Sequence, residues 1–372
     1  MSPKIYVFTG TRAEYGLLKS VVRELVQLKT NVTLLVSGSH LSKNYGRTLE
    51  EIESDALAPL IQSDIGLYDN TPTGICASMG QAISNYGQIL GEHRPNILIV
   101  LGDRYESFCA VAAAVVQRIP VAHLYGGETT LGAIDEYFRN AMTTMAQLHF
   151  TSCEKYSQKV IQLGADPRKT WNVGALGVEN AKKLSVLPLE EVGKYLGIPD
   201  GESWILATYH PETMSQCHPA EQVAIVAEAL DTLAPLHVVF TGANADSGGQ
   251  IVNNWLKQWA EQSPLHHFFM SLGVERYINA ARYAKAVVGN SSSGVIEIPS
   301  LHVPVLDIGK RQKGRVRAAS VIHCKFSQDN ITSTLKKLFS QEILIVAKHA
   351  TNPYDQPETA KTIASIITRH VM

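Results

Sequence analysis

The sequence predicts an α/β protein built from two Rossmann-like, doubly wound domains that face a central cleft. Three observations predict this fold class. Apolar runs typical of buried parallel strands alternate with amphipathic segments of helical period along most of the chain. The alternation breaks once, over residues 171–202, and then restarts. With 372 residues, the chain is also too long for one hydrophobic core and fits two domains of ordinary size.

The first half alternates strictly. Its predicted strands are the apolar runs at residues 4–10, 31–38, 96–100, 120–125 and 148–152. Its predicted helices have apolar residues at helical spacing and cover residues 14–28, 42–53, 74–92, 107–117 and 136–146. Strands that alternate with helices predict a parallel sheet with right-handed crossover connections.

The second half repeats this rhythm after the linker at 171–202. Its predicted strands are residues 203–209, 236–242, 266–271, 286–290, 303–309 and 320–324. Its predicted helices are residues 219–233, 247–260, 275–284, 292–299, 328–340 and 355–370. We therefore expect domains at 1–175 and 176–350, with a last helix in 351–372 that packs back on the first domain. This arrangement, called GT-B-like, is common among enzymes that use nucleotide sugars, but periplasmic binding proteins have a similar one, so the fold alone does not decide the function.

Composition excludes several classes of protein. Apolar residues make up 45% of the chain and charged residues only 18%, which is typical of a well-buried globular protein. A net charge of −1 provides no overall field for nucleic acid or for an anionic membrane. The five cysteines are far apart and have no metal-ligand spacing, which favours a reducing cytoplasm and argues against zinc and disulfides. The N-terminus begins a strand at once, and no apolar run reaches the roughly 18 residues of a membrane helix, so we expect a cytoplasmic protein.

Charged residues gather where the strand at 96–100 gives way to the next helix, in the stretch VLGDRYESF at 100–108. Asp103 fits a helix N-cap, and Glu106 follows at the capping-box position. The carboxyl ends of parallel strands are also where open α/β sheets bind ligands. Helix capping and a ligand site are both consistent with this stretch.

Acidic side chains follow two adjacent strands of the first half: Asp103, Glu106, Glu128, Asp135 and Glu136. Buried carboxylates need partners, and Arg104 and Arg139 could supply them in a structural ion-pair network. The functional alternative is a set of carboxylates with separated pKa values that perform acid and base chemistry.

Two glycine-containing loops are candidate phosphate sites. TGTRAEYG at 9–16 lacks the full dinucleotide-binding glycine fingerprint, but Arg12 within it could donate forked hydrogen bonds to phosphate oxygens. An ordinary surface arginine is equally consistent with this position. In VVGNSSSGVIEIPS at 287–300, a helix is predicted to begin near Ser292, and backbone N–H groups and hydroxyls at such a start favour an anion. An ordinary serine N-cap is the alternative, but it would account for one serine and not for all three with their two flanking glycines. The candidate residues of this second loop are Gly289, Asn290, Ser291, Ser292 and Glu297. Glu297 lies too far along the helix to cap its start; it could accept two ribose hydroxyls or be an ordinary charge on the helix surface.

Two further segments end strands of the second half. DIGKRQKGRVRAAS at 307–320 is rich in basic residues, among which Arg311 and Arg317 are candidates to neutralise a diphosphate; a solvated surface is the alternative. ATYHPETM at 207–214 places His210 just before a proline at a strand end. The position of His210 is equally consistent with a catalytic role and with a structural role.

Taken in order, these segments resemble one family. They are TGTRAEYG, LGDRYE, GGETTLGAIDE, YHPET, GANADSGG, GNSSSGVIEIPS, IGKRQKGRVRAAS and NPYD. The sequence is similar, over essentially its whole length, to the hydrolysing UDP-N-acetylglucosamine 2-epimerases of bacterial sialic-acid synthesis. It departs from these relatives at Tyr125, where they have Glu or His, and at Asn140, where a His is usual.

The resemblance implies roles for individual residues. It implies that UDP is held by Arg12, Ser291, Ser292, Glu297 and Arg311, and that the sugar is surrounded by Asp103, Asp135, Glu136 and His210. The implied partners are a UDP-sugar substrate and the UDP product, with no metal or nicotinamide cofactor. We also expect a homodimer or homotetramer.

The implied reaction removes the C2 proton of the sugar while UDP departs from C1, which gives a 2-acetamidoglucal. Water then adds and releases N-acetylmannosamine. Carboxylates suit the proton transfers, and a cationic site suits the departing diphosphate. A sister branch that acts on UDP-2,4-diacetamido-2,4,6-trideoxyglucose fits nearly as well. A non-catalytic nucleotide-sugar-binding protein and a two-domain glycosyltransferase remain as alternatives of other classes.

Overall fold

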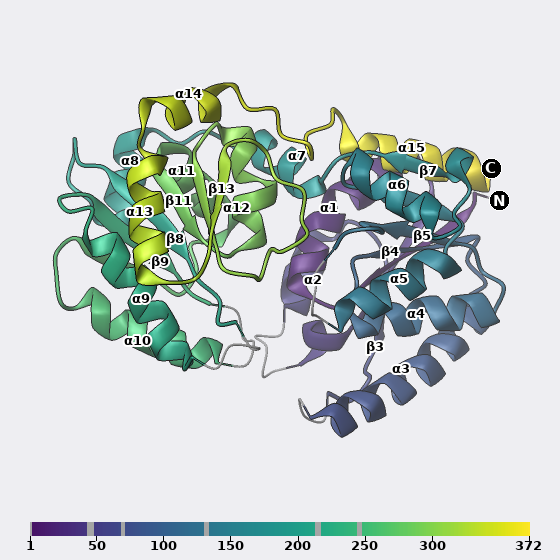
Figure 1. Cartoon of the computed structure of the whole chain (residues 1–372). Helices are drawn as coiled ribbons and strands as arrows, with labels where there is room; N and C mark the ends of the chain where they lie inside the picture. Colours follow the sequence, from purple (N-terminus) through teal and green to yellow (C-terminus); the bar gives the residue numbers. More distant parts are fainter. Residues whose placement is uncertain (1, 43–47, 68–70, 130–133, 213–216, 244–247) are drawn as a thin grey trace. The chain divides into compact units, whose positions relative to one another are not determined.

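The computed structural model describes residues 2–42, 48–67, 71–129, 134–212, 217–243 and 248–372 (Figure 1). Parts of three motifs from the sequence, at 130–133, 213–216 and 244–247, lie outside these ranges. The chain forms two compact units, one of residues 1–180 with 356–372 and one of residues 181–355. The expected boundaries after residues 175 and 350 lie slightly upstream of these, and the last helix belongs to the first unit.

The first unit contains a seven-stranded parallel sheet in the order β3-β2-β1-β4-β5-β6-β7. Its strands are β1 (Lys4–Thr9), β2 (Asn31–Ser37), β3 (Leu60–Ser63), β4 (Ile97–Leu101), β5 (Val121–Leu124), β6 (Leu148–Thr151) and β7 (Thr170–Asn172). The central strands are buried on both faces, which is why they appear in the sequence as continuous apolar runs.

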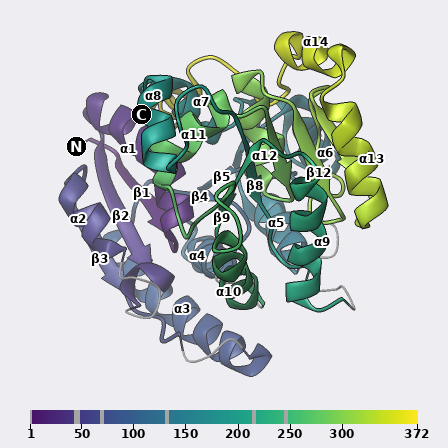
Figure 2. The same ribbon diagram turned by 90° about the vertical axis from the view of Figure 1, so that its left-hand side faces the viewer.

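Helices cover both faces of this sheet (Figures 1 and 2). They are α1 (Arg12–Gln27), α2 (Leu49–Asp55), α3 (Pro72–His93), α4 (Tyr105–Val116), α5 (Asp135–Met145), α6 (Glu154–Gln162), α7 (Leu176–Lys183), which crosses the unit boundary, and α15 (Thr359–Val371). One core contains side chains of α1, α2 and α15, and a second contains side chains of α3, α4 and α5. Because α15 buries Ile363 and Ile367 beside α1, the chain's last helix completes the first core.

The second unit contains a six-stranded parallel sheet in the order β10-β9-β8-β11-β12-β13. Its strands are β8 (Trp204–Thr208), β9 (His237–Thr241), β10 (His266–Phe269), β11 (Ala286–Gly289), β12 (Val305–Ile308) and β13 (Val321–Cys324). Its helices are α8 (Leu189–Leu196), α9 (Pro219–Asp231), α10 (Gly249–Ala260), α11 (Gly273–Tyr283), α12 (Ser292–Ile296), α13 (Gln328–Leu338) and α14 (Gln341–His349). One core packs against α9, α10 and α13, and the other against α8, α11 and α12.

The predicted pair of doubly wound α/β units is confirmed, with every strand predicted for the second half. The sequence analysis missed β3, β7, α6 and α14. It was also wrong to treat 171–202 as a linker, because α7 and α8 lie there. Both missed strands are short edge strands with partly exposed residues, so they lack the apolar run that marks the central strands.

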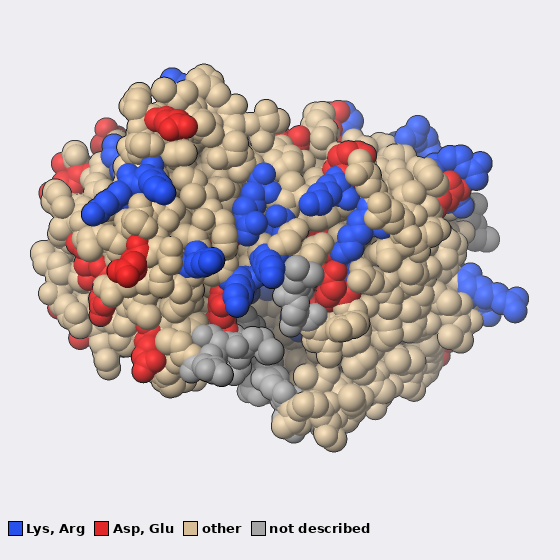
Figure 3. Space-filling model, in the orientation of Figure 1, with Lys and Arg blue, Asp and Glu red and all other residues tan. Residues whose placement is uncertain are grey.

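The surface carries charges of both signs. On the face drawn in Figure 3, basic and acidic side chains both occur, and neither kind covers a whole unit. No helix within the described ranges is long and apolar enough to cross a bilayer.

Candidate functional residues at each switch point

Each sheet has one point where the strand order reverses. In the first unit it lies between β1 and β4, and in the second between β8 and β11. Connections from neighbouring strands leave in opposite directions there, which makes a crevice at the carboxyl ends of the strands where such folds bind ligands. Arg12 and Asp103 follow the two strands of the first switch point, and His210 and Ser291 follow those of the second.

The loop after β1 is held by a capping box. Thr11 accepts a hydrogen bond from the N–H of Glu14, and the Glu14 carboxylate accepts from the N–H groups of Gly10, at 2.7 Å, and Thr11, at 3.1 Å. Burial raises the pKa of Glu14 to about 7. Arg12 therefore begins α1 at a fixed position, where its exposed side chain pairs with Glu51 at 3.0 Å. The phosphate-binding role of Arg12 stays a prediction.

Asp103 follows Gly102, whose φ of +83° is in the left-handed region that glycine adopts easily. The Asp103 carboxylate pairs with the guanidinium of Arg139, which is almost fully buried. Arg139 also donates hydrogen bonds to the carboxylate of Glu136 and to the carbonyl oxygen of Glu128, both at 2.8 Å. The buried guanidinium of Arg139 thus contacts three of the predicted acidic residues: the carboxylates of Asp103 and Glu136 and the carbonyl oxygen of Glu128.

The capping interpretation of the stretch at 100–108 is wrong for the described residues. The N-cap of α4 is Arg104, not Asp103, and it makes no side-chain capping bond among them. Glu106 instead accepts two hydrogen bonds from Arg104, at 2.9 and 3.1 Å. Glu106 therefore supports the structure, whereas Asp103 belongs to the Arg139 cluster.

Glu128 and Glu136 have further partners. Lys159 of α6 donates to Glu136 at 2.8 Å, and Ser152 donates to the buried carboxylate of Glu128 at 2.7 Å. Glu136 thus pairs with two cations, as in a structural ion-pair network, whereas the carboxylate of Glu128 accepts a hydrogen bond from a neutral hydroxyl group. Because α6 was not predicted, Lys159 could not be found from the sequence.

Asp135 differs from the other carboxylates of the cluster. It is the first residue of α5, and burial, followed by the nearby negative charge of Asp103, raises its pKa to about 6. A carboxylate of this basicity accepts a proton more readily than an ordinary aspartate while it is still ionised at neutral pH. Asp135 is therefore the strongest candidate for a general base in the first unit.

The second switch point depends on Gly289, the last residue of β11. Its φ is +141°, and a Cβ atom there would lie 1.8 Å from the carbonyl oxygen of Thr208. Only glycine allows the two strand ends to approach this closely. The next residue, Asn290, is fully buried and forms two hydrogen bonds with the main chain of His210.

His210 is buried and electrically neutral. Burial, helped by the charge of Arg311, lowers the pKa of His210 to about 3. Its imidazole therefore serves as a neutral hydrogen-bonding group near pH 7, and a role that begins from the protonated ring is unfavourable.

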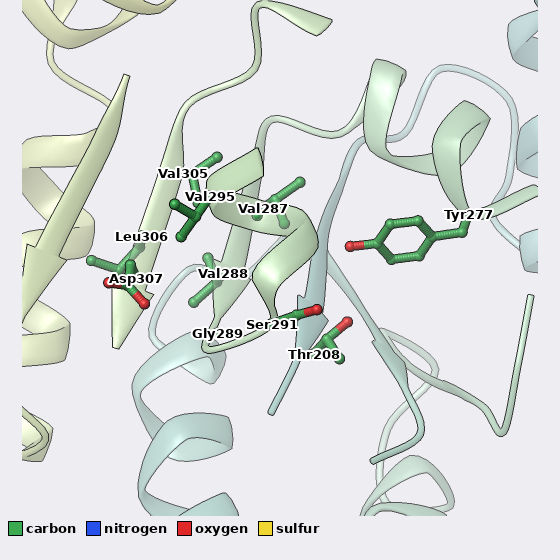
Figure 4. A pocket seen from close by; sticks show the side chains of 11 residues that line it. Thr208, Tyr277, Val287, Val288, Gly289, Ser291, Val295, Val305, Leu306 and Asp307 are labelled. Atoms are coloured by element: carbon green, nitrogen blue, oxygen red, sulfur yellow. The ribbon is translucent and has the colours of Figure 1, made fainter. Parts of the chain in front are cut away.

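The loop after β11 starts a helix as predicted. Ser291 is the N-cap of α12, which begins at Ser292, and Glu297 is its C-cap. The Ser291 side chain makes no capping bond among the described residues, so simple N-capping does not explain it. Ser291, Thr208 and Tyr277 line a small pocket, and the Tyr277 hydroxyl points toward the other two side chains (Figure 4). No signal in the sequence pointed to Tyr277, because it comes from α11 and not from a strand end.

The two arginines of the basic segment have different environments. Arg311 donates to the carbonyl oxygen of Asn290 at 3.3 Å, which places its guanidinium beside the start of α12. Arg317 donates twice to the buried carboxylate of Asp307, at 2.6 and 3.0 Å. The surroundings favour an anion-binding role for Arg311 and a structural role for Arg317.

Among the described residues, no group of three or more His, Cys, Asp or Glu side chains is placed to hold a metal ion. The polar groups at the first switch point are mainly acidic, and those at the second are hydroxyls, amides, the neutral imidazole of His210 and an arginine. The first set suits proton transfer, and the second suits an anion.

The comparison with protein families decides the identity. A family model described as UDP-N-acetylglucosamine 2-epimerase matches residues 23–368. The chain belongs to the UDP-N-acetylglucosamine 2-epimerase family. It is therefore an enzyme of this family, not a non-catalytic binding protein, and the resemblance expected from the sequence is confirmed.

Individual proteins that are similar to this epimerase-family chain support the same family assignment. Polysialic acid biosynthesis protein P7 of Escherichia coli is 35% identical over 356 residues, which are 94% of this chain and 90% of that protein. The GDP/UDP-N,N'-diacetylbacillosamine 2-epimerase (hydrolyzing) of Campylobacter jejuni is 33% identical over 341 residues, which are 91% of this chain and 88% of that protein. The solved structure of UDP-GlcNAc 2-epimerase from Neisseria meningitidis bound to UDP-GlcNAc shares the fold, with a TM-score of 0.81 at 18% identity over 98% of this chain and 100% of that chain.

Proposed function

We propose that the chain is a hydrolysing 2-epimerase that converts UDP-N-acetylglucosamine and water into N-acetylmannosamine and UDP. The observation that supports this proposal is that the two switch points present different kinds of side chain. The first presents carboxylates around Arg139, including Asp135 with a pKa of about 6. The second presents Ser291 and Arg311, which suit a diphosphate.

The chemistry follows from the bonds that must change. A carboxylate removes the C2 proton, and the C2–H electron pair forms the C1–C2 double bond as the C1–O bond breaks. UDP leaves with the electron pair of that bond, and 2-acetamidoglucal remains. Water then delivers a hydroxyl group to C1 and a proton to C2, now with the opposite configuration at C2. Because the C2 proton is weakly acidic, removal of the proton and departure of UDP must assist each other.

Each of these steps is assigned to particular residues. Asp135 is assigned the first proton transfer because its raised pKa matches the task. Asp103 and Glu136 complete the acidic surroundings of the sugar, while Glu128 mainly supports Glu136 through their shared partners Arg139 and Lys159. Arg311, with Ser291 and Ser292, stabilises the negative charge on the departing UDP.

A second substrate is supported by a specific observation. The Campylobacter relative at 33% identity carries the name of a hydrolysing diacetylbacillosamine 2-epimerase. The same elimination and hydration on UDP-2,4-diacetamido-2,4,6-trideoxyglucose would need only a different fit around C4 and C6. The bond changes at C1 and C2 are identical for the two sugars.

The test is to incubate the purified protein with each UDP-sugar alone in deuterated water. We expect equal amounts of UDP and free 2-epimerised sugar, with deuterium at C2 from the hydration step. Oxygen-18 from labelled water should appear at C1 of the sugar and not in UDP, because the C1–O bond breaks. Free sugar with its original configuration and protium at C2 would mean simple hydrolysis and would overturn the proposal. The faster of the two UDP-sugars identifies the substrate.

A further inference from the structure

His123 lies at the centre of β5 and is completely buried. Its Nε2 is 2.8 Å from the carbonyl oxygen of Gly102, the residue before Asp103. Its Nδ1 is 3.2 Å from the hydroxyl of Thr143 on α5. His123 thus connects the loop that carries Asp103 with the helix that carries Asp135 and Glu136.

The partners of His123 determine which nitrogen carries the proton. Burial lowers the pKa of His123 to about 4, so the ring is neutral near pH 7 and has one N–H group. The carbonyl oxygen of Gly102 can only accept a hydrogen bond, so the N–H group is on Nε2. Nδ1 then has a lone pair that faces the hydroxyl of Thr143.

Thr143 completes the connection to Arg139. Its hydroxyl lies 2.9 Å from the carbonyl oxygen of Arg139, one turn earlier on α5. The side chain of Arg139 in turn pairs with Asp103. The contacts therefore connect Gly102 through His123 to Thr143, on the turn of α5 that follows Arg139, and Arg139 pairs with Asp103. The one hydroxyl proton of Thr143 is shared between two acceptors, Nδ1 of His123 and the carbonyl oxygen of Arg139.

We propose that His123 and Thr143 are positioning residues that hold the Asp103–Arg139 pair in its reactive geometry. Neither has to touch the sugar. His123 fixes the carbonyl group directly before Asp103, and Thr143 fixes the turn of α5 that presents Arg139. The inference rests on the proposed function, because it gives Asp103 a place at the reacting sugar.

Two replacements of His123 separate its two hydrogen bonds. In His123→Gln, the amide nitrogen takes the place of Nε2 and can still donate to Gly102. In His123→Asn, the amide nitrogen takes the place of Nδ1 and cannot reach Gly102. We expect His123→Asn to lower kcat about tenfold to a hundredfold with little change in KM, since small displacements of catalytic groups have costs of this size. His123→Gln should recover much of the loss.

The matched control is His149, which pairs in register with His123 on the neighbouring strand β6. It is also buried, and burial lowers its pKa to about 4 as well, but its Nδ1 has no hydrogen-bond partner among the described residues. His149→Asn should therefore lower stability and leave kcat unchanged. Equal losses of kcat in His149→Asn and His123→Asn, or no recovery in His123→Gln, would show a merely structural role and overturn the proposal.

Thr143 is tested by Thr143→Ser, which keeps the hydroxyl, and Thr143→Val, which removes it at nearly constant volume. Only the valine variant should lose kcat. A readout without substrate is nitrogen-15 NMR of the histidine rings, with His123→Asn identifying the His123 signals. A proton on Nδ1 would overturn the inference whether or not the enzyme turns over. Absence of turnover by the unchanged enzyme on either UDP-sugar, with a proton found on Nε2, would instead count against the proposed function.

Discussion

Both polar atoms of the Asn290 side chain form hydrogen bonds with the main chain of His210. Its amide group donates to the carbonyl oxygen of His210 at 2.8 Å, and its Oδ1 accepts from the N–H of His210 at 2.7 Å. Because the two residues follow β11 and β8, these bonds join the loops on either side of the second switch point. The carbonyl oxygen of Asn290 also accepts hydrogen bonds from the side chains of Arg311 and Gln312. The buried side-chain amide of Asn290 therefore holds the main chain of His210 in place, and the carbonyl oxygen of Asn290 orients the side chain of Arg311.

Asn290→Asp should weaken UDP binding and lower stability. The change removes the donor to His210 and buries a charge, and an unsatisfied buried polar group costs about 1–3 kcal/mol. Asn253 provides a matched control, because it makes the same pair of bonds to Ala243 in another loop, at 2.7 and 3.1 Å. Asn253→Asp should lower the unfolding free energy similarly but leave UDP affinity unchanged in calorimetry. Equal affinity losses in both variants would contradict a specific role for Asn290.

Arg311→Ala should weaken UDP binding by about 1.5–3 kcal/mol, the usual contribution of a hydrogen bond to a charged group. Arg317→Ala should behave differently, because it leaves the buried carboxylate of Asp307 without the arginine bonds that it now accepts. We expect early thermal unfolding and nearly normal UDP affinity at low temperature. Calorimetry and thermal melts of both variants would reveal reversed roles if Arg317 were the phosphate ligand.

Turnover should fall in acid with an apparent pKa near 6. Burial and the charge of Asp103 raise the pKa of Asp135 to about 6, and a base must be ionised to accept a proton. kcat/KM should therefore decrease about tenfold for each pH unit below 6. Asp135→Asn and Asp103→Asn should each lower turnover about a hundredfold or more and still bind UDP. A flat pH profile between 5 and 7 would argue against Asp135 as the base.

Stability should decrease between about pH 6.5 and pH 4. Burial lowers the pKa of four deeply buried histidines to about 4 or below: His40, His123, His149 and His210. Their stabilisation is present above the unfolded-state pKa of about 6.5 and is lost as the pH falls, because the unfolded chain then binds more protons. Glu14 and Asp135, with raised pKa values, act in the opposite direction but are fewer. Urea denaturation at pH 7 and pH 5 measures the difference, and greater stability at pH 5 would contradict it.

Much of the fold could be predicted because central parallel strands are buried on both faces. The strands Ile97–Leu101 and Ala286–Gly289 are buried throughout and contain no polar side chain, and the sequence shows this directly. The edge strands β3 and β7 are short and partly exposed, so burial leaves no such pattern in them. The helices α7 and α8 were missed for a related reason: they lie where strands and helices stop alternating.

The sequence by itself determined which residue types stand at the strand ends, and with them the family and the candidate chemistry. It could not decide how those residues divide into roles. Asp103 and Glu106 are equally acidic in the sequence, but one pairs with buried Arg139 and the other with Arg104. Arg311 and Arg317 are equally basic, but only Arg317 binds the carboxylate of Asp307. The raised pKa of Asp135 also depends on burial and on a charge 32 positions away in the chain, between residues 103 and 135. These properties arise from desolvation and from contacts between distant segments, which exist only after the chain has folded.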